Sequence, residues 1–125
     1  MPVTVGLQGQ SHMTVGDTDT SIAFHSGDVP VLATPRLVAL LEEATVHALT
    51  GHLDDGQTTV GMRVQIDHLA PTGVGIDVRA TATLEAVEGR RLTFSAEATD
   101  GTSPVASATI TRVVVDTSRF LERVS

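Results

Sequence analysis

The chain has 125 residues, and its eight basic and fifteen acidic side chains give a net charge of −7 when the histidines are neutral. It has no cysteine, which excludes disulfides, zinc ribbons, iron–sulfur clusters and a thiol nucleophile. All basic residues are arginine, so a lysine Schiff base is excluded as well. The acidic charge and the presence of only three aromatic residues argue against nucleic-acid binding. The length and the 41% of hydrophobic residues predict one folded domain over residues 1–125.

The N-terminal residues contain no basic segment followed by an apolar run of signal-peptide length. Apolar stretches elsewhere are only a few residues long, whereas a membrane-spanning helix needs about 20. We therefore expect a cytoplasmic protein that does not bind membranes.

The first expected element is a strand. Apolar residues alternate at Val3, Val5 and Leu7, and the pattern resumes at Met13 and Val15 before a Gly-Asp-Thr-Asp turn.

A long helix is the next expected element. Thr34 is a candidate N-cap, Pro35 suits the first helical position, and Gly51 is a candidate C-cap. Between them apolar residues recur every three or four positions, at Leu37, Val38, Leu40, Leu41, Ala44, Ala48 and Leu49. Because this helix is apolar around most of its surface, we expect other elements to enclose it.

Four strands and a short terminal helix complete the pattern. The strands are expected at residues 58–69, 75–87, 92–99 and 105–116, with turns at Glu88-Gly89-Arg90 and Asp100-Gly101. Alanines on their inward-facing positions leave room for a helix to lie close to the sheet. A long central helix followed by antiparallel strands describes an α+β hotdog fold, with a curved antiparallel sheet of about five strands wrapped around the helix.

The five histidines contain no metal-binding pattern. His47 and His52 are five residues apart across the expected helix end, whereas ligands on one helical face need a spacing of three or four. We read both as residues of a solvated helix terminus, and His12 and His25 as surface residues.

Three polar residues interrupt expected apolar faces. Glu42 lies in the middle of the helix, next to Glu43, and a buried carboxylate costs several kcal/mol unless it is paired or reaches water. His68 ends a strand and Arg112 interrupts the inward face of the last one. From the pattern alone, each of the three is either a structural or surface residue or part of a functional site.

Four segments in this order resemble the fluoroacetyl-CoA thioesterase family of hotdog proteins. They are residues 31–42 (VLATPRLVALLE), 60–68 (VGMRVQIDH), 87–92 (VEGRRL) and 111–113 (TRV). The resemblance implies hydrolysis of acyl-CoA thioesters without a metal or other cofactor, coenzyme A being part of the substrate. It implies that Thr34, Glu42 and His68 form the catalytic set.

The resemblance also implies that Gly61 brings backbone close to the thioester and that Arg112 assists substrate binding or gating. Coenzyme A is polyanionic and this chain is acidic, so local arginines must contact its phosphates. The candidates are Arg36, Arg63, Arg90 and Arg91, although the last two also suit an ordinary charged turn.

Helix geometry limits how the catalytic set can meet. Thr34 and Glu42 are eight residues apart, hence about 80° and about 12 Å along one straight helix. The substrate, a bend at the helix entry or a second subunit must bring the groups together. Since hotdog proteins are usually dimers with sites between subunits, we expect a homodimer or a dimer of dimers.

The chain departs from the family pattern before the helix. Family members carry bulky aromatic lid residues there, but His25-Ser26-Gly27-Asp28-Val29-Pro30 has none, and Pro35 and Arg36 replace a small and an aromatic residue. We therefore expect a small or medium acyl group without strong selectivity for fluoroacetyl.

Two other functions remain open from the sequence. One is a non-catalytic hotdog module that binds an acyl-CoA or a carrier-bound acyl group. The other is an enoyl-CoA hydratase, whose longer Asp–His signature the sequence does not contain.

Overall fold

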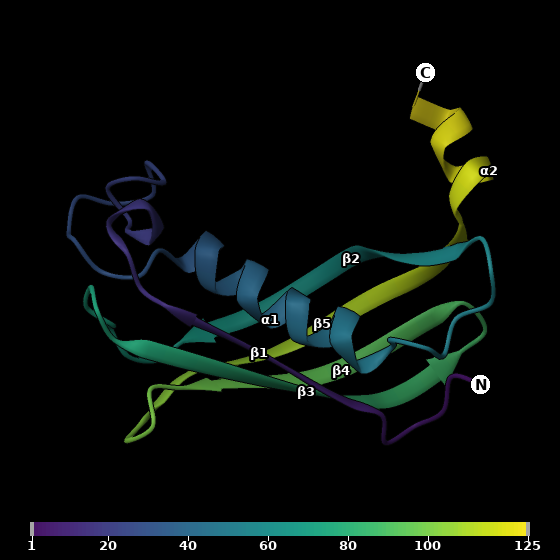
Figure 1. The fold of residues 1–125 in the computed structure, drawn as a ribbon, viewed down its shortest axis with the longest axis horizontal. Helices are drawn as coiled ribbons and strands as arrows, with labels where there is room; N and C mark the ends of the chain where they lie inside the picture. The colour runs from purple at the N-terminus through teal and green to yellow at the C-terminus, as the bar shows by residue number, and fades with distance from the viewer. Residues whose placement is uncertain (1, 125) are drawn as a thin grey trace.

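The computed structural model describes residues 2–124, and its sheet of five antiparallel strands curves around one long helix (Figure 1). The strands are β1 (Gln8–Thr14), β2 (Gln57–His68), β3 (Asp77–Glu88), β4 (Arg91–Thr99) and β5 (Pro104–Asp116). The helices are α1 (Thr34–Ala48) and α2 (Thr117–Leu121), with short 3-10 turns at Asp17–Asp19 (η1) and Glu122–Val124 (η2). The expected hotdog architecture is therefore confirmed. No helix among residues 2–124 is long and apolar enough to cross a membrane.

The strand order in the sheet is β1-β3-β4-β5-β2, so β1 and β2 form its two edges. The β2–β5 register runs from the Gln57–Asp116 pair at one end of the sheet to the His68–Ala106 pair at the other. Figure 1 shows α1 lying along one face of the sheet, while α2 stands away from it beyond the end of β5.

The core lies between α1 and the inner face of the sheet. The buried face of α1 consists of Leu37, Leu40, Leu41, Ala44, Thr45 and Ala48. Facing sheet positions include the small residues Ala80, Ala82, Ala96, Ala98 and Ala106. Gly9 of β1 sits so close to the helix that a β-carbon there would collide with the backbone of Ala44 and Ala48. Small side chains thus let the helix and the sheet approach closely, as the sequence predicted.

Two local predictions were wrong. The first strand does not include Val3 or Val5, because Gly6 adopts φ 101° and turns the chain before β1 begins at Gln8. Thr34 is not the N-cap: Ala33 holds that position without a side-chain cap, and Thr34 is the first helical residue. The Thr34 hydroxyl is bonded elsewhere, to His68.

A β-bulge in β2 shapes the inner face near α1. The β2–β5 register shifts between Gly61 and Arg63, so one extra residue is inserted in β2. Gly61 and His68 are seven residues apart, and in a regular strand an odd separation places residues on opposite faces. The bulge reverses the alternation, and both residues face α1.

Candidate active site

The first candidate pair joins the start of α1 to the end of β2. Thr34 Oγ1 lies 2.8 Å from His68 Nδ1, and the His68 Nε2 atom is buried without a hydrogen-bond partner among residues 2–124. A pocket of about 320 Å³ opens beside the pair. Its lining residues are Ser21, Val31, Leu32, Thr34, His68, Leu69, Ala70 and Pro71.

The N-terminus of α1 offers backbone donors at this pair. The first helical hydrogen bond runs from the Leu37 N–H to the Ala33 carbonyl, and Pro35 has no N–H. The N–H groups of Thr34 and Arg36 find no acceptor in the described part of the chain. Free N–H groups and the positive end of the helix dipole favour an oxyanion here.

The second candidate pair lies halfway along α1. Arg112 Nη1 donates to Glu42 Oε2 at 3.0 Å. Thr59 of β2 holds the same guanidinium, accepting from Nε with its hydroxyl at 2.9 Å and from Nη2 with its carbonyl at 3.1 Å. The Arg112 side chain is only 8% exposed, while that of Glu42 is 33% exposed.

Burial and the ion pair act in opposite directions on the pKa of Arg112. Burial lowers the pKa of Arg112, and the Glu42 carboxylate opposes that shift. Both groups satisfy the rule that a buried charge needs a partner. Only Oε2 of Glu42 bonds to Arg112, so Oε1 stays available to water or substrate.

Gly61 lies directly beside the Glu42 carboxylate. A β-carbon at Gly61 would collide with Glu42 Oε2 and would also come within 3.6 Å of Arg112 Nη1. Gly61 therefore provides the space that the ion pair occupies.

The two pairs do not meet within one chain. No hydrogen bond within residues 2–124 links Thr34 or His68 to Glu42, and the eight-residue separation along α1 corresponds to about 12 Å. The expectation that these groups cannot bond directly is thus borne out, because α1 runs unbroken from Thr34 to Ala48.

The four other candidate arginines are dispersed. Arg36 pairs with Asp19 at 3.1 Å, and Arg63 is exposed beside the β2 bulge. Arg90 and Arg91 lie at the β3–β4 hairpin, where Arg91 is opposite Val113 near the end of β5. This hairpin is at the opposite end of the sheet from His68.

The remaining histidines lie apart from both pairs. His47 Nδ1 contacts the Gln10 carbonyl at 2.5 Å, and His52 Nδ1 contacts the Pro2 carbonyl at 3.2 Å. His12 and His25 are exposed, as predicted. Within residues 2–124, no group of three histidine, cysteine or acidic side chains could hold a metal ion.

Two residues that support the candidate site were not predicted from the sequence. Thr59 accepts two hydrogen bonds from Arg112. Asp19 accepts hydrogen bonds from Ala33 and Arg36, which lie before and after Thr34 in the chain. The Asp19 carbonyl accepts from the Ala33 N–H at 2.9 Å, and its carboxylate accepts from Arg36 Nε. A threonine in a strand and an aspartate in a turn are too common to signal these roles in advance.

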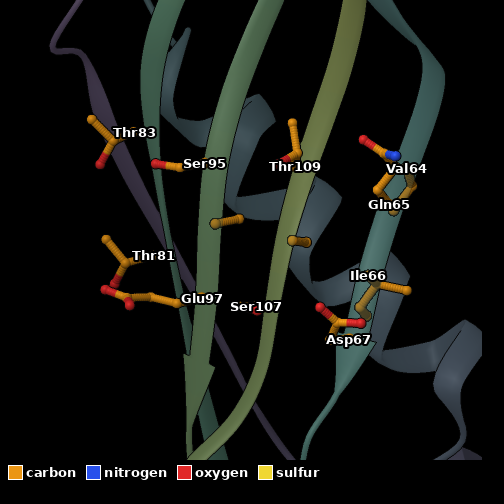
Figure 2. Close-up of a pocket in the computed structure, with 12 residues that line it drawn as sticks. Val64, Gln65, Ile66, Asp67, Thr81, Thr83, Ser95, Glu97, Ser107 and Thr109 are labelled. Atoms are coloured by element: carbon orange, nitrogen blue, oxygen red, sulfur yellow. The ribbon is translucent and has the colours of Figure 1, made fainter.

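A larger hollow lies elsewhere, on the face of the sheet away from α1 (Figure 2). It measures about 890 Å³, and Figure 2 shows Thr81, Thr83, Ser95 and Thr109 on one part of it and Asp67 on another. The lining of this hollow does not include Thr34, Glu42 or His68. Its lining contains no histidine and no arginine, so the candidate catalytic residues are those of the two pairs along α1.

Comparison with known proteins gives two matches to one family of thioesterases. The model of the family of fluoroacetyl-CoA-specific thioesterases matches residues 15–118. The chain is 37% identical to a fluoroacetyl-CoA thioesterase of Streptantibioticus cattleyicolor over 94 residues, which are 75% of this chain and 68% of the relative.

Solved structures give the same result. The fluoroacetyl-CoA thioesterase FlK superimposes with a TM-score of 0.93 at 30% identity, covering 99% of this chain and 96% of the other. A hot-dog-like protein from Thermanaerovibrio acidaminovorans gives a TM-score of 0.87 at 32% identity, covering 96% and 89%.

Proposed function

Because the chain belongs to the fluoroacetyl-CoA-specific thioesterase family and is an acyl-CoA thioesterase, we propose that it releases a small or medium acyl group from coenzyme A. We propose Thr34, Glu42 and His68 as its catalytic residues. The observation that carries the assignment is the 2.8 Å contact between the Thr34 hydroxyl and His68 at the free N-terminus of α1.

In this mechanism the thioester carbonyl oxygen lies at the start of α1. The N–H groups of Thr34 and Arg36 stabilise the negative charge that develops on that oxygen. When His68 Nδ1 carries a proton and donates it to Thr34 Oγ1, the hydroxyl hydrogen of Thr34 is free to donate to the same oxygen. His68 thus orients the hydroxyl.

Glu42 performs the bond-making step by one of two routes. In the first, its carboxylate takes a proton from water, the hydroxide attacks the carbonyl carbon, and the carbon–sulfur bond breaks. In the second, the carboxylate itself attacks, coenzyme A leaves as thiolate, and water hydrolyses the resulting anhydride. Both routes release a carboxylic acid and coenzyme A, and both need the free Oε1 of Glu42.

The lining beside Thr34 and His68 supports the acyl specificity that we propose. That pocket of about 320 Å³ has no aromatic side chain, and Phe24 lies in the exposed loop before it, outside the lining. We therefore keep the prediction of a small or medium acyl group without strong fluoroacetyl selectivity.

The oligomer belongs to the same proposal. Edge strand β2 has one side unpaired, and Met62 on it is 49% exposed. Pairing β2 antiparallel with β2 of a second copy brings the Gln57 end of one strand toward the His68 end of the other. Such a homodimer would set Thr34 and His68 of one subunit against Glu42 and Arg112 of its partner. The expectation of a cytoplasmic location stays a prediction.

Thiol release from a panel of acyl-CoAs tests the activity. We expect turnover of short and medium acyl chains, and its loss in Glu42→Ala, with Glu43→Ala as the matched control on the neighbouring exposed position. Unchanged turnover in Glu42→Ala would refute the assignment of Glu42.

Mixing two inactive variants tests the shared site. If sites are shared, a mixed dimer of Thr34→Val and Glu42→Ala has one site with both mutations and one intact site. After subunit exchange, activity should return to about a quarter of wild type, since about half the dimers are mixed and each has one intact site of two. No recovery despite confirmed exchange, or a monomer by sizing at micromolar concentration, would contradict the shared site.

A further inference from the structure

A second pocket lies where the C-terminal helix leaves the sheet, far from His68. It measures about 440 Å³. Its lining consists of Arg90, Val113, Val114, Val115, Asp116, Arg119, Phe120 and Arg123. Figure 1 shows α2 standing beyond the end of β5, so this pocket is formed between the helix and the last residues of that strand.

The charge of this pocket is opposite to that of the chain. Arg90, Arg119 and Arg123 are three of only eight cations in a chain of net charge −7. The ion pairs Arg36–Asp19 and Arg112–Glu42 involve none of the three. Arg90 is fixed over β5 because its Nη1 donates to the Val114 carbonyl at 3.3 Å.

The one carboxylate in the lining is already bonded. Asp116 caps α2, and its Oδ1 accepts from the Arg119 N–H at 3.3 Å and from Ser118 Oγ at 3.1 Å. The hydrogen bond from the Arg119 backbone, the bonds from Ser118 and the positive charge of Arg119 lower the pKa of Asp116. The lining therefore carries three arginines against one aspartate, which is bonded to the start of α2, so the charges of the lining sum to a positive excess.

We propose that this pocket binds the phosphorylated nucleotide end of coenzyme A. Guanidinium groups bind phosphate oxygens through paired charge-assisted hydrogen bonds. Phe120 and the three valines supply an apolar wall for a base or an aliphatic arm. The inference rests on the proposed function and adds the residues that select coenzyme A over other thioesters.

The position of the pocket fits a ligand that reaches Glu42. Arg112, which holds Glu42, is four residues before Asp116 on β5, a distance of about 13 Å. The extended arm between the thioester and the phosphates of coenzyme A can cover that distance. His68 lies about 36 Å away along β2, so in a shared site the pocket belongs to the subunit that supplies Glu42.

The match to the family of fluoroacetyl-CoA-specific thioesterases ends at residue 118, and Arg119, Phe120 and Arg123 lie beyond it. Among the arginines predicted from the sequence to contact phosphate, the pocket includes Arg90 alone.

A comparison of two thioesters of the same acyl group distinguishes the loss of a contact with coenzyme A from a general loss of activity. One is the acyl-CoA, and the other is the N-acetylcysteamine thioester, which lacks the nucleotide and all phosphates. The test variant is Arg119→Gln with Arg123→Gln, and the control is Arg79→Gln, an exposed arginine of β3 outside both sites.

We expect the double variant to raise KM for acyl-CoA at least tenfold, with kcat and the KM of the short thioester unchanged. The control should leave all constants unchanged. An unchanged KM for acyl-CoA, or an equal rise for both thioesters, would overturn the proposal.

Titration of the protein with free coenzyme A gives a measurement that does not need turnover. The double variant should bind at least tenfold more weakly than wild type, and raising the salt concentration should weaken wild type more than the variant. If wild type turns over neither thioester but shows this pattern, the proposed function fails and the binding site stands. Equal affinity for coenzyme A in wild type and double variant would remove the site.

Discussion

Replacing Gly61 by alanine should lower kcat by about 10²-fold while leaving the fold intact. The new methyl group would collide with the Glu42 carboxylate, the flexible end of a side chain, so the carboxylate moves and the backbone does not. Gly61 does not adopt a positive φ, so alanine adds no backbone strain.

Two magnitudes follow from the displaced carboxylate. A hydrogen bond between charged groups contributes about 1.5–3 kcal/mol, and Glu42 is one-third exposed, so we expect a loss of about 1–2 kcal/mol in the free energy of unfolding. A displacement of about 1 Å at a reacting group costs about 10²-fold in rate, so kcat should fall by about that factor.

Thiol-release kinetics and denaturant unfolding measure the two effects, and two controls isolate the cause. Gly73→Ala adds a methyl group into open space and should change neither quantity. In a Glu42→Ala background, Gly61→Ala should cause no further loss of rate, because the displaced group is gone. A kcat within twofold of wild type in Gly61→Ala, or an equal loss in Gly73→Ala, would refute the reasoning.

Three further changes have defined outcomes. Thr34→Val removes the hydroxyl and should lower kcat by about 10²-fold, whereas Thr34→Ser should keep most of it; equal rates in steady-state assays would contradict the role. Gly9→Ala forces a methyl group against the backbone of Ala44 and Ala48 and should lower thermal stability by about 3 kcal/mol or more; an unchanged melting temperature would show that β1 can move away. Hydrogen bonds from Thr102 and Ser103 lower the pKa of Asp100. The ionised Asp100 carboxylate therefore stabilises the fold at neutral pH, and this stabilisation is lost as the pH falls through the folded-state pKa. Asp100→Ala should therefore lose less stability than wild type between about pH 5 and about pH 3, and equal losses in acid unfolding would contradict the shift.

The regular elements could be predicted because periodicity and turn residues mark them. The limits of α1 and of the last three strands fall within two residues of the structure, and the positive φ of Gly89 and Gly101 agrees with the predicted turns. The strand predicted from Val3 failed because alternation alone does not show that Gly6 turns the chain.

The site residues were predictable as chemical types, but their arrangement was not. Nothing in residues 60–68 marks a bulge at Met62, yet without it Gly61 and His68 would face opposite sides of the sheet. Likewise, Arg112 was recognised as an interruption of an apolar face, but its partner Thr59 lies 53 residues earlier in the chain. Such contacts depend on the register of the strands. The hydrophobic pattern shows which face of the sheet a residue occupies, but not which residue of the neighbouring strand lies opposite it.

The free atoms of the two pairs indicate how the site is completed. His68 is bonded to Thr34 through Nδ1, while its Nε2 has no partner in the described residues. Glu42 is bonded to Arg112 through Oε2, while its Oε1 has no partner in the described residues. A thioester needs its oxyanion donors and its base within about 3 Å of the reacting atoms, yet about 12 Å of α1 separates Thr34 from Glu42. Both pairs are fixed by hydrogen bonds to neighbouring strands, so a small rearrangement within one chain cannot close that distance. In the proposed mechanism, therefore, the pairs act together across a substrate or a subunit boundary, and the proposed homodimer supplies the second half of the site along the edge of β2.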